Sequence, residues 1–372
     1  MAGSAQGAAP LSFLFASLLV AFSALAFAEL SSRLPRSAGE AVYVNEGFGS
    51  RHLALVTGLL VVFAGLISCA TITRGFVGYL QVFVELPWWL GVAGVVVGLG
   101  LLAAWGIAES VSLAALLTLI EAAGLVFVIW SGRESLASLP ERWPELLPPA
   151  EAGAWLGVLS GAVVAFYAFI GFEDMVNVAE EVKDVTRTLP LAILATLGLT
   201  TLFYLLLGLV AVMVVPPPEL AASEAPLALV VQRSGGGDGA WISVIAILAV
   251  LNGALVQVIM ASRVLYGLSN RGWLPPVLAT VHPKRRTPVL ATAVVTGIAL
   301  IFALGLPLET LARTTSLVTL VIFALVNLAL WRIKARDPAP EGVLLFPRWL
   351  SLCGFLACAA VLVIEGGRLL LT

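Results

Sequence analysis

Charged side chains are scarce in this sequence. Asp, Glu, Lys and Arg make up 11% of its 372 residues, whereas soluble domains contain about 25%. The chain is instead 60% hydrophobic, with a mean hydropathy of +1.05. Apolar runs of about 20 residues, long enough to cross the hydrocarbon core of a bilayer, recur along its whole length. We therefore predict an all-α polytopic membrane protein, one bundle over residues 1–372, rather than a soluble domain.

Histidine and cysteine are also rare. The two histidines, His52 and His282, lie in predicted loops, and Cys69, Cys353 and Cys358 lie inside apolar segments. Cys and His supply most transition-metal ligands, so no metal site and no cofactor are expected. Without an intramembrane histidine, nucleophile–base pair or metal cluster, the chain is not expected to be an enzyme. The net charge of −2 gives no indication of a nucleic-acid partner, and none is expected.

Prolines and glycine-rich stretches divide the apolar sequence into about ten predicted transmembrane helices. Their expected bounds are Leu11–Leu30, Leu53–Phe83, Pro87–Ile107, Val111–Ser131, Trp155–Ala179, Pro190–Val215, Trp241–Leu268, Pro288–Leu304, Leu308–Arg332 and Pro347–Gly367.

Lysine and arginine concentrate in alternate connections, among them 33–51, 271–286 and 332–348. Because such an excess marks the cytoplasmic side, these connections are predicted to lie inside. This orientation places Met1 outside, although the uncharged start does not resemble a signal peptide. One further helix before Met1 is the hypothesis that accounts for this arrangement.

The most informative stretch is FYAFIGFEDMVNVAEEVK, residues 166–183. It begins as an apolar span, meets Gly171, and continues with two acids. A helix may break at membrane depth only where protein or a water-filled cavity satisfies its backbone, and transporters build substrate sites at such breaks. Freed N–H groups and a half-helix N-terminus would bind a carboxylate. The candidate substrate-binding residues are Phe166, Phe169, Ile170, Gly171 and Phe172, with ordinary packing as the alternative role for the aromatic rings.

Glu121 lies near the middle of the Val111–Ser131 span and has no basic neighbour in sequence. Burial favours the protonated form of such a carboxyl, so Glu121 is a candidate for proton coupling. The alternative is a permanently neutral acid that is hydrogen-bonded to a neighbouring helix.

Glu173 and Asp174 follow the predicted break and are further coupling or gating candidates. They are equally suited to satisfying the start of the second half-helix, or to pairing with Arg74 or Arg263. Asn252 could line a path through the bundle or serve as polar contact between helices.

Four stretches resemble amino acid permeases of the amino acid–polyamine–organocation (APC) superfamily. Residues 166–190 resemble that family's sixth helix and the loop after it. Residues 27–49 resemble the end of its second helix, 109–130 its fifth, and 261–288 the end of its eighth. The resemblance covers nearly the whole chain.

The resemblance implies two inverted five-helix repeats, with a site where the family's first and sixth helices unwind. Residues 1–135 would be the remainder of the first repeat, 154–335 the second repeat, and 345–372 an extra C-terminal helix. The family's first helix would be missing. Some relatives carry a lysine on the fifth helix. Glu121 is the only charged residue of the span here, so that lysine's role does not transfer.

The resemblance also implies a secondary active transporter that moves amino acids by coupled symport or exchange. A proton is the expected coupling ion, a small or neutral amino acid the expected substrate, and a bacterial inner (plasma) membrane the expected location. The alternative is a non-transporting sensor, or a truncated remnant of such a permease.

Overall fold

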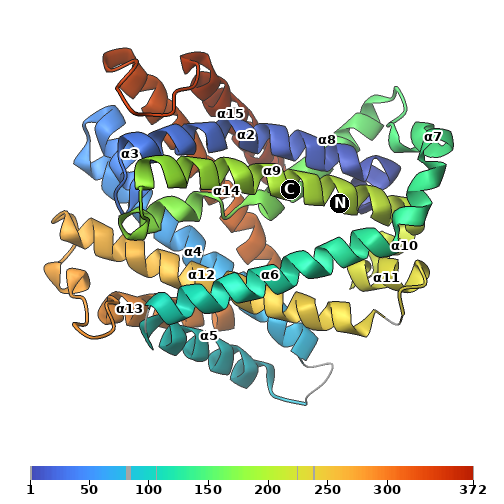
Figure 1. Cartoon of the computed structure of the whole chain (residues 1–372), viewed down its shortest axis with the longest axis horizontal. Coiled ribbons are helices and arrows are strands. Elements are labelled where there is room, and N and C mark those ends of the chain that lie inside the picture. Colours follow the sequence, from blue (N-terminus) through green and yellow to red (C-terminus); the bar gives the residue numbers. More distant parts are fainter. Residues whose placement is uncertain (1, 81–84, 106, 224, 238, 372) are drawn as a thin grey trace. The chain divides into compact units, whose positions relative to one another are not determined.

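The computed structural model describes residues 2–80, 85–105, 107–223, 225–237 and 239–371. Within these residues, ten helices contain 17 residues or more (Figure 1). They are α2 (Ala9–Arg33), α4 (Arg51–Leu80), α5 (Trp88–Trp105), α6 (Ile107–Ser131), α8 (Ala152–Phe169), α9 (Val185–Val214), α12 (Ala240–Asn270), α13 (Val289–Gly305), α14 (Leu308–Arg336) and α15 (Arg348–Leu371).

The predicted all-α membrane fold is confirmed. Among the described residues, eight helical segments are long and apolar enough to cross a membrane, and α13 and the apolar part of α15 are shorter. Each of the ten predicted spans overlaps one long helix, but Trp155–Ala179 also takes in most of a separate 3₁₀ segment, Glu173–Glu181. The predicted end of the second span at Phe83 lies outside the described residues. Most bounds differ by a few residues, because charged or polar residues extend the helix beyond its apolar run, as at the end of α14.

The structure also contains short helices in segments where the sequence predicts only connections. Proline begins or nearly begins three of them: α7 (Leu139–Arg142), α10 (Pro217–Ala222) and α11 (Pro226–Arg233). Its fixed φ angle and missing N–H suit the first turn of a helix. A fourth, α3 (Gly39–Phe48), is mostly buried although it lies between two long helices.

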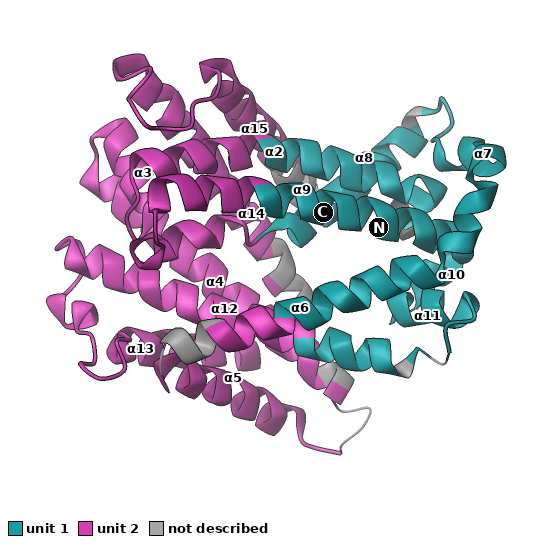
Figure 2. Ribbon diagram, in the orientation of Figure 1, with its two compact units in different colours: residues 1–21, 118–170, 195–248 teal, residues 22–117, 171–194, 249–372 magenta. Residues whose placement is uncertain are grey.

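The chain forms two compact units (Figure 2). Unit 1 contains residues 1–21, 118–170 and 195–248, and unit 2 contains 22–117, 171–194 and 249–372. Each unit draws on both predicted repeats, so the repeat boundaries stay a prediction.

The core of unit 1 lies between parts of α6, α8, α9 and the short helices. Val158, Val210 and Val230 are completely buried there. The Ser12 hydroxyl donates a hydrogen bond to the Val158 carbonyl at 2.9 Å. Arg142 donates to the Met213 carbonyl at 2.9 Å, which ties the short helices to the end of α9.

The core of unit 2 is organised around α14, which packs against α3, α4 and α15. Close approach to α3 depends on a small residue: a Cβ added to Gly47 would lie 2.6 Å from the Cα of Ala329 on α14. The Arg332 guanidinium donates to the Gly47 carbonyl at 2.9 Å. Helix α3 is thereby held against the bundle rather than left in solvent.

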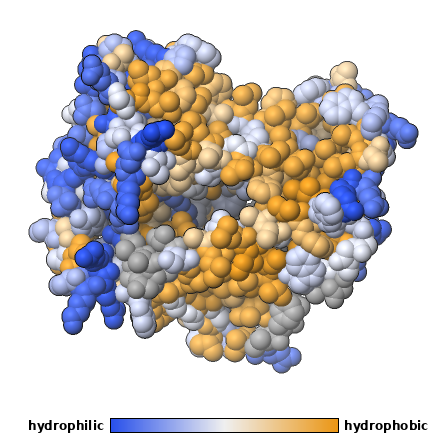
Figure 3. Space-filling model, in the orientation of Figure 1, coloured by the Kyte–Doolittle hydropathy of each residue, from blue (hydrophilic) through white to orange (hydrophobic). Residues whose placement is uncertain are grey.

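The long helices of both units expose large apolar side chains. Leu119 is 69% exposed in unit 1, and Ile301 and Val363 are 67% and 75% exposed in unit 2. Hydrophobic residues cover wide areas of the visible helices, whereas hydrophilic residues gather near connections such as α7 (Figure 3). Apolar surface on this scale indicates contact with lipid in a multi-pass membrane protein.

Candidate functional site

The helix predicted to break near Gly171 does break there. Helix α8 ends at Phe169, Ile170 is extended with ψ 134°, and Gly171 has φ +130°. Residues with a Cβ rarely adopt such a φ angle, so glycine is required by the backbone rather than by space. A 3₁₀ segment, η4 (Glu173–Glu181), follows. The break falls at the boundary between the two units: Ile170 belongs to unit 1 and Gly171 to unit 2.

Three of the predicted site residues lie before the break, in unit 1. Phe166 is 1% exposed and Phe169 is 5% exposed. The Phe169 ring packs edge-on against Tyr204 with centroids 5.0 Å apart, and the Tyr204 hydroxyl donates to the Ala168 carbonyl at 2.7 Å. The last turn of α8 is therefore fixed by one tyrosine of α9, and Ile170 follows it directly.

Glu121 also belongs to unit 1 and is half-buried on α6. It is close enough to Tyr204 to act on it electrostatically. Glu121 and the end of α8 thus have Tyr204 as a common neighbour, which the sequence alone does not show.

Phe172 lies after the break, in unit 2. Its ring centroid is 5.7 Å from that of Phe27 and 5.5 Å from that of Phe323. Phe27 and Phe323 also contact each other at 5.4 Å. Such an aromatic cluster packs η4 onto α2 and α14, and its edge-to-face geometry is favourable.

The two acids after the break are buried and hydrogen-bonded. Glu173 Oε2 accepts a hydrogen bond from the Gly171 N–H at 2.8 Å, so Glu173 satisfies one of the backbone groups that the break releases. Asp174 Oδ2 accepts from the Gln257 side-chain amide of α12 at 2.7 Å. Both donors are neutral.

Arg74 and Arg263, the two predicted partners of these acids, bind other groups in the structure. Arg263 forms an ion pair with Glu181 at 3.0 Å. Arg74 donates to the Leu306 carbonyl and lies over the Trp88 ring. Asn252, the remaining coupling candidate, is 6% exposed on α12, five residues before Gln257.

A third acid, Glu40 of α3, belongs to the same surroundings and was not among the predicted site residues. It is 1% exposed, and its Oε1 accepts from the Asn177 side-chain amide of η4 at 3.1 Å. Helix α3 lies outside the candidate spans. Burial raises the pKa of Glu40 to about 8, and the nearby Glu173 charge also raises it. Burial and the Glu40 charge raise the pKa of Tyr43 well above its usual value.

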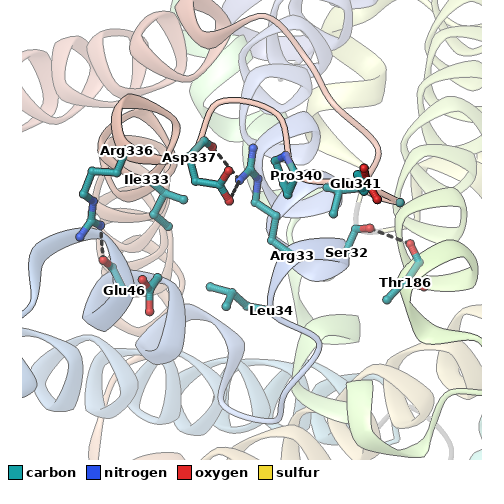
Figure 4. A pocket seen from close by; sticks show the side chains of 12 residues that line it. Ser32, Arg33, Leu34, Glu46, Thr186, Ile333, Arg336, Asp337, Pro340 and Glu341 are labelled. Atoms are coloured by element: carbon teal, nitrogen blue, oxygen red, sulfur yellow. Dashed lines mark hydrogen bonds and ion pairs between the residues drawn. The ribbon is translucent and has the colours of Figure 1, made fainter.

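A cavity of about 470 Å³ opens in unit 2 beside the ends of α2, α3 and α14 (Figure 4). Its guanidinium groups are already bonded: Arg33 to Glu29 and Asp337, and Arg336 to the carbonyls of Glu46 and Gly47. None of the predicted site residues lines it. The polar residues that line the cavity therefore serve to hold the neighbouring helix ends and connections together.

Comparison with known proteins decides the family. A family model described as amino acid permease matches residues 1–367. The chain belongs to this amino acid permease family. It is 27% identical, over 88% of its own length and 74% of the relative's, to a branched-chain amino acid permease of Bacillus subtilis. It is 30% identical to the vacuolar cationic amino acid transporter 4 of Arabidopsis thaliana, over 89% of its own length and 58% of the relative's.

A methylthioribose transporter of Bacillus subtilis is also similar, with 27% identity over 90% of this chain and 76% of the relative. The names of these permeases refer to different classes of substrate. Membership of the family therefore supports amino acid transport without selecting one amino acid.

Proposed function

We propose that this permease is a secondary active transporter that carries amino acids across the membrane, by symport or exchange coupled to protons. The observation that carries the proposal is the break between Phe169 and Glu173 in a helix long and apolar enough to span a bilayer. Broken helices place backbone polar groups and a half-helix terminus at membrane depth, where they can bind an amino acid.

The contact between Glu173 and the Gly171 N–H suggests how a proton and a substrate are coupled. The ionised Glu173 carboxylate occupies a backbone donor that a substrate carboxylate would use. Charge-assisted hydrogen bonds are roughly twice as strong as neutral ones, so protonation of Glu173 weakens its hold on this donor. Binding of the proton and of the amino acid then favour each other.

Uptake by purified protein in liposomes tests this function. We expect a panel of radiolabelled amino acids to identify at least one that accumulates when the outside is more acidic, and does not accumulate without the gradient. Binding of an amino acid without flux would replace the transporter with the sensor alternative. No binding and no flux for any amino acid would refute the proposal.

Substitution of each coupling candidate separates their roles. A Glu173→Gln protein should keep exchange and lose the dependence of uptake on pH, because the amide mimics a protonated carboxyl. If Glu121 carries the proton instead, Glu121→Gln should have this effect. A Glu121→Gln protein whose uptake keeps its pH dependence excludes Glu121.

We further propose that the protein functions in the plasma membrane of a bacterium. Its Ala-, Leu- and Gly-rich, lysine-poor composition supports this location. Fractionation of the native host tests it, and recovery in another membrane would contradict it.

A further inference from the structure

The N-terminal half of α3 is docked onto the segment that follows the helix break. Asn177 of η4 makes two of the contacts: its side-chain oxygen accepts from the Gly39 N–H at 3.1 Å, and its amide donates to Glu40 at 3.1 Å. The Ser37 N–H donates to Glu180 at 3.1 Å. A Cβ on Gly39 would lie 2.6 Å from the Val176 side chain, so glycine permits the close approach.

Glu40 is the only titratable group of α3 in this docked surface besides Tyr43, and both are buried without full hydrogen bonding. Within the described part of the chain, Glu40 Oε2 and the Tyr43 hydroxyl have no hydrogen-bond partner. Glu40 is 1% and Tyr43 0% exposed. The Tyr43 hydroxyl would lie 3.1 Å from a Cβ added to Gly39, and the Val176 side chain would lie 2.6 Å from the same Cβ, so the hydroxyl is on the side of α3 that approaches η4.

The charges around Glu40 are acidic. Glu173 and Asp174 of η4 interact with it electrostatically. On α14, Arg332 and Arg336 bind carbonyls at the other end of α3, about 10 Å along the helix axis from Glu40.

Among the described side chains of α4 and α14, the other lysine and arginine groups bind elsewhere. Lys334 binds Glu29. On α4, Arg51 donates to the Gly272 carbonyl, Arg74 donates to the Leu306 carbonyl, and His52 lies beside Arg51 in the first turn.

We propose that Glu40 is a proton-binding site of this permease. The bound proton neutralises the Glu40 carboxylate, which lies in the contact between α3 and the segment after the helix break. The inference rests on the proposed proton coupling. A bare carboxylate with an unsatisfied oxygen is costly to bury, whereas the neutral acid costs less. Release leaves a carboxylate on Glu40 and passes the proton to water. The negative charge then adds to that of Glu173 and Asp174 and weakens the docked contact.

Infrared difference spectra of the purified protein between acidic and alkaline pH report protonated carboxyl groups directly, without transport. We expect the wild type to show a protonated-carboxyl band that disappears with a midpoint near pH 8. Glu40→Gln should lose the part of this signal that belongs to one carboxyl. Glu46→Gln, which changes an exposed acid of the same helix, should keep it.

A second variant covers the case in which Glu40→Gln does not fold. Asn177→Leu removes the hydrogen bond that favours the ionised form of Glu40, so the midpoint should move to higher pH. An unchanged spectrum in either of these variants, provided that the variant folds, would overturn the proposal.

Transport assays on the same proteins separate this proposal from the proposed function. Glu40→Gln should still exchange amino acids at equal pH and lose accumulation driven by a pH gradient. Accumulation equal to that of the wild type would contradict a role for Glu40 in coupling. If the wild type moves no amino acid but its carboxyl signal is lost in Glu40→Gln, the proton site stands and the transport function fails.

Discussion

Glu29 and Glu40 are both almost completely buried in unit 2, at 0% and 1% exposure, but their surroundings differ. Both oxygens of Glu29 accept hydrogen bonds from Lys334 at 2.6 Å, and Arg33 pairs with Glu29 at 2.8 Å. The Phe346 N–H also donates to Glu29, at 3.0 Å. Glu40 instead has one neutral amide donor and acidic neighbours.

The difference separates a structural carboxylate from one that can change its charge. Two cations, Arg33 and Lys334, lie beside the Glu29 carboxylate. Lys334 connects α2 to α14, and the Phe346 N–H connects α2 to the segment before α15. No cation compensates the Glu40 carboxylate among its described contacts, so burial favours the protonated, neutral form of Glu40. Burial alone therefore does not indicate function, whereas burial without a compensating charge does.

The largest effect is expected at the compensated carboxylate. Glu29→Gln leaves Lys334 buried without its acid and leaves Arg33 with Asp337 alone, and removal of one partner from a buried ion pair costs about 3–5 kcal/mol. We expect a strong fall in thermal stability of the purified protein in detergent. Glu46→Gln, at an exposed site, is the control and should match the wild type. If both variants melt like the wild type, the network does not stabilise the fold.

The dependence of stability on pH should come in part from Glu40. Its folded-state pKa, about 8, lies above the ordinary value of 4.5, so the folded protein binds this proton more tightly than the unfolded chain. The resulting stabilisation is complete below about pH 4.5 and is lost as the pH rises through about 8. Melting temperatures across this range should fall more for the wild type than for Glu40→Gln. Parallel curves would show that Glu40 does not titrate there.

Gly171→Ala tests whether the break itself is needed for transport. An alanine at φ +130° is strained by about 1–3 kcal/mol, so the break must rearrange. A change of 1.4 kcal/mol, within this range, corresponds to about tenfold, and we expect amino acid uptake to fall by about this factor. Gly153→Ala, also in open space but inside α8, should have no such effect. Equal uptake by the two variants would mean that the backbone at Gly171 is not required.

The smallest effect is expected for Tyr43→Phe. The Tyr43 hydroxyl is buried and has no hydrogen-bond partner among the residues that the structure describes. Its removal should therefore leave the free energy of unfolding unchanged or raise it by up to about 1 kcal/mol. A loss of several degrees in melting temperature would show that the hydroxyl has a partner in the functioning protein.

The sequence predicts the long helices and the break well, because both depend on residues that are close together in the chain. Apolar runs mark each span, and Gly171 followed by two acids marks the break. The surroundings of Glu40 could not be predicted in this way, since Asn177 lies 137 residues away in the chain. Lys334 is likewise 305 residues from Glu29.

The sequence contains only a weak local indication of helix α3. Its segment follows Pro35 and Arg36, which indicate a connection, but Ala41, Val42 and Val44 form an apolar run just after Glu40. A short apolar run beside an acid is compatible with a buried helix. Only long-range packing against α4 and α14 decides that it is one.

The most direct test of the whole account is the proton flux that accompanies amino acid transport. Purified protein in liposomes with an entrapped pH-sensitive dye would receive a transported amino acid from outside, at equal starting pH. We expect the interior to acidify in step with uptake, and Glu173→Gln to take up or exchange the amino acid without acidification. Amino acid uptake by the wild type with no change in internal pH would contradict proton coupling.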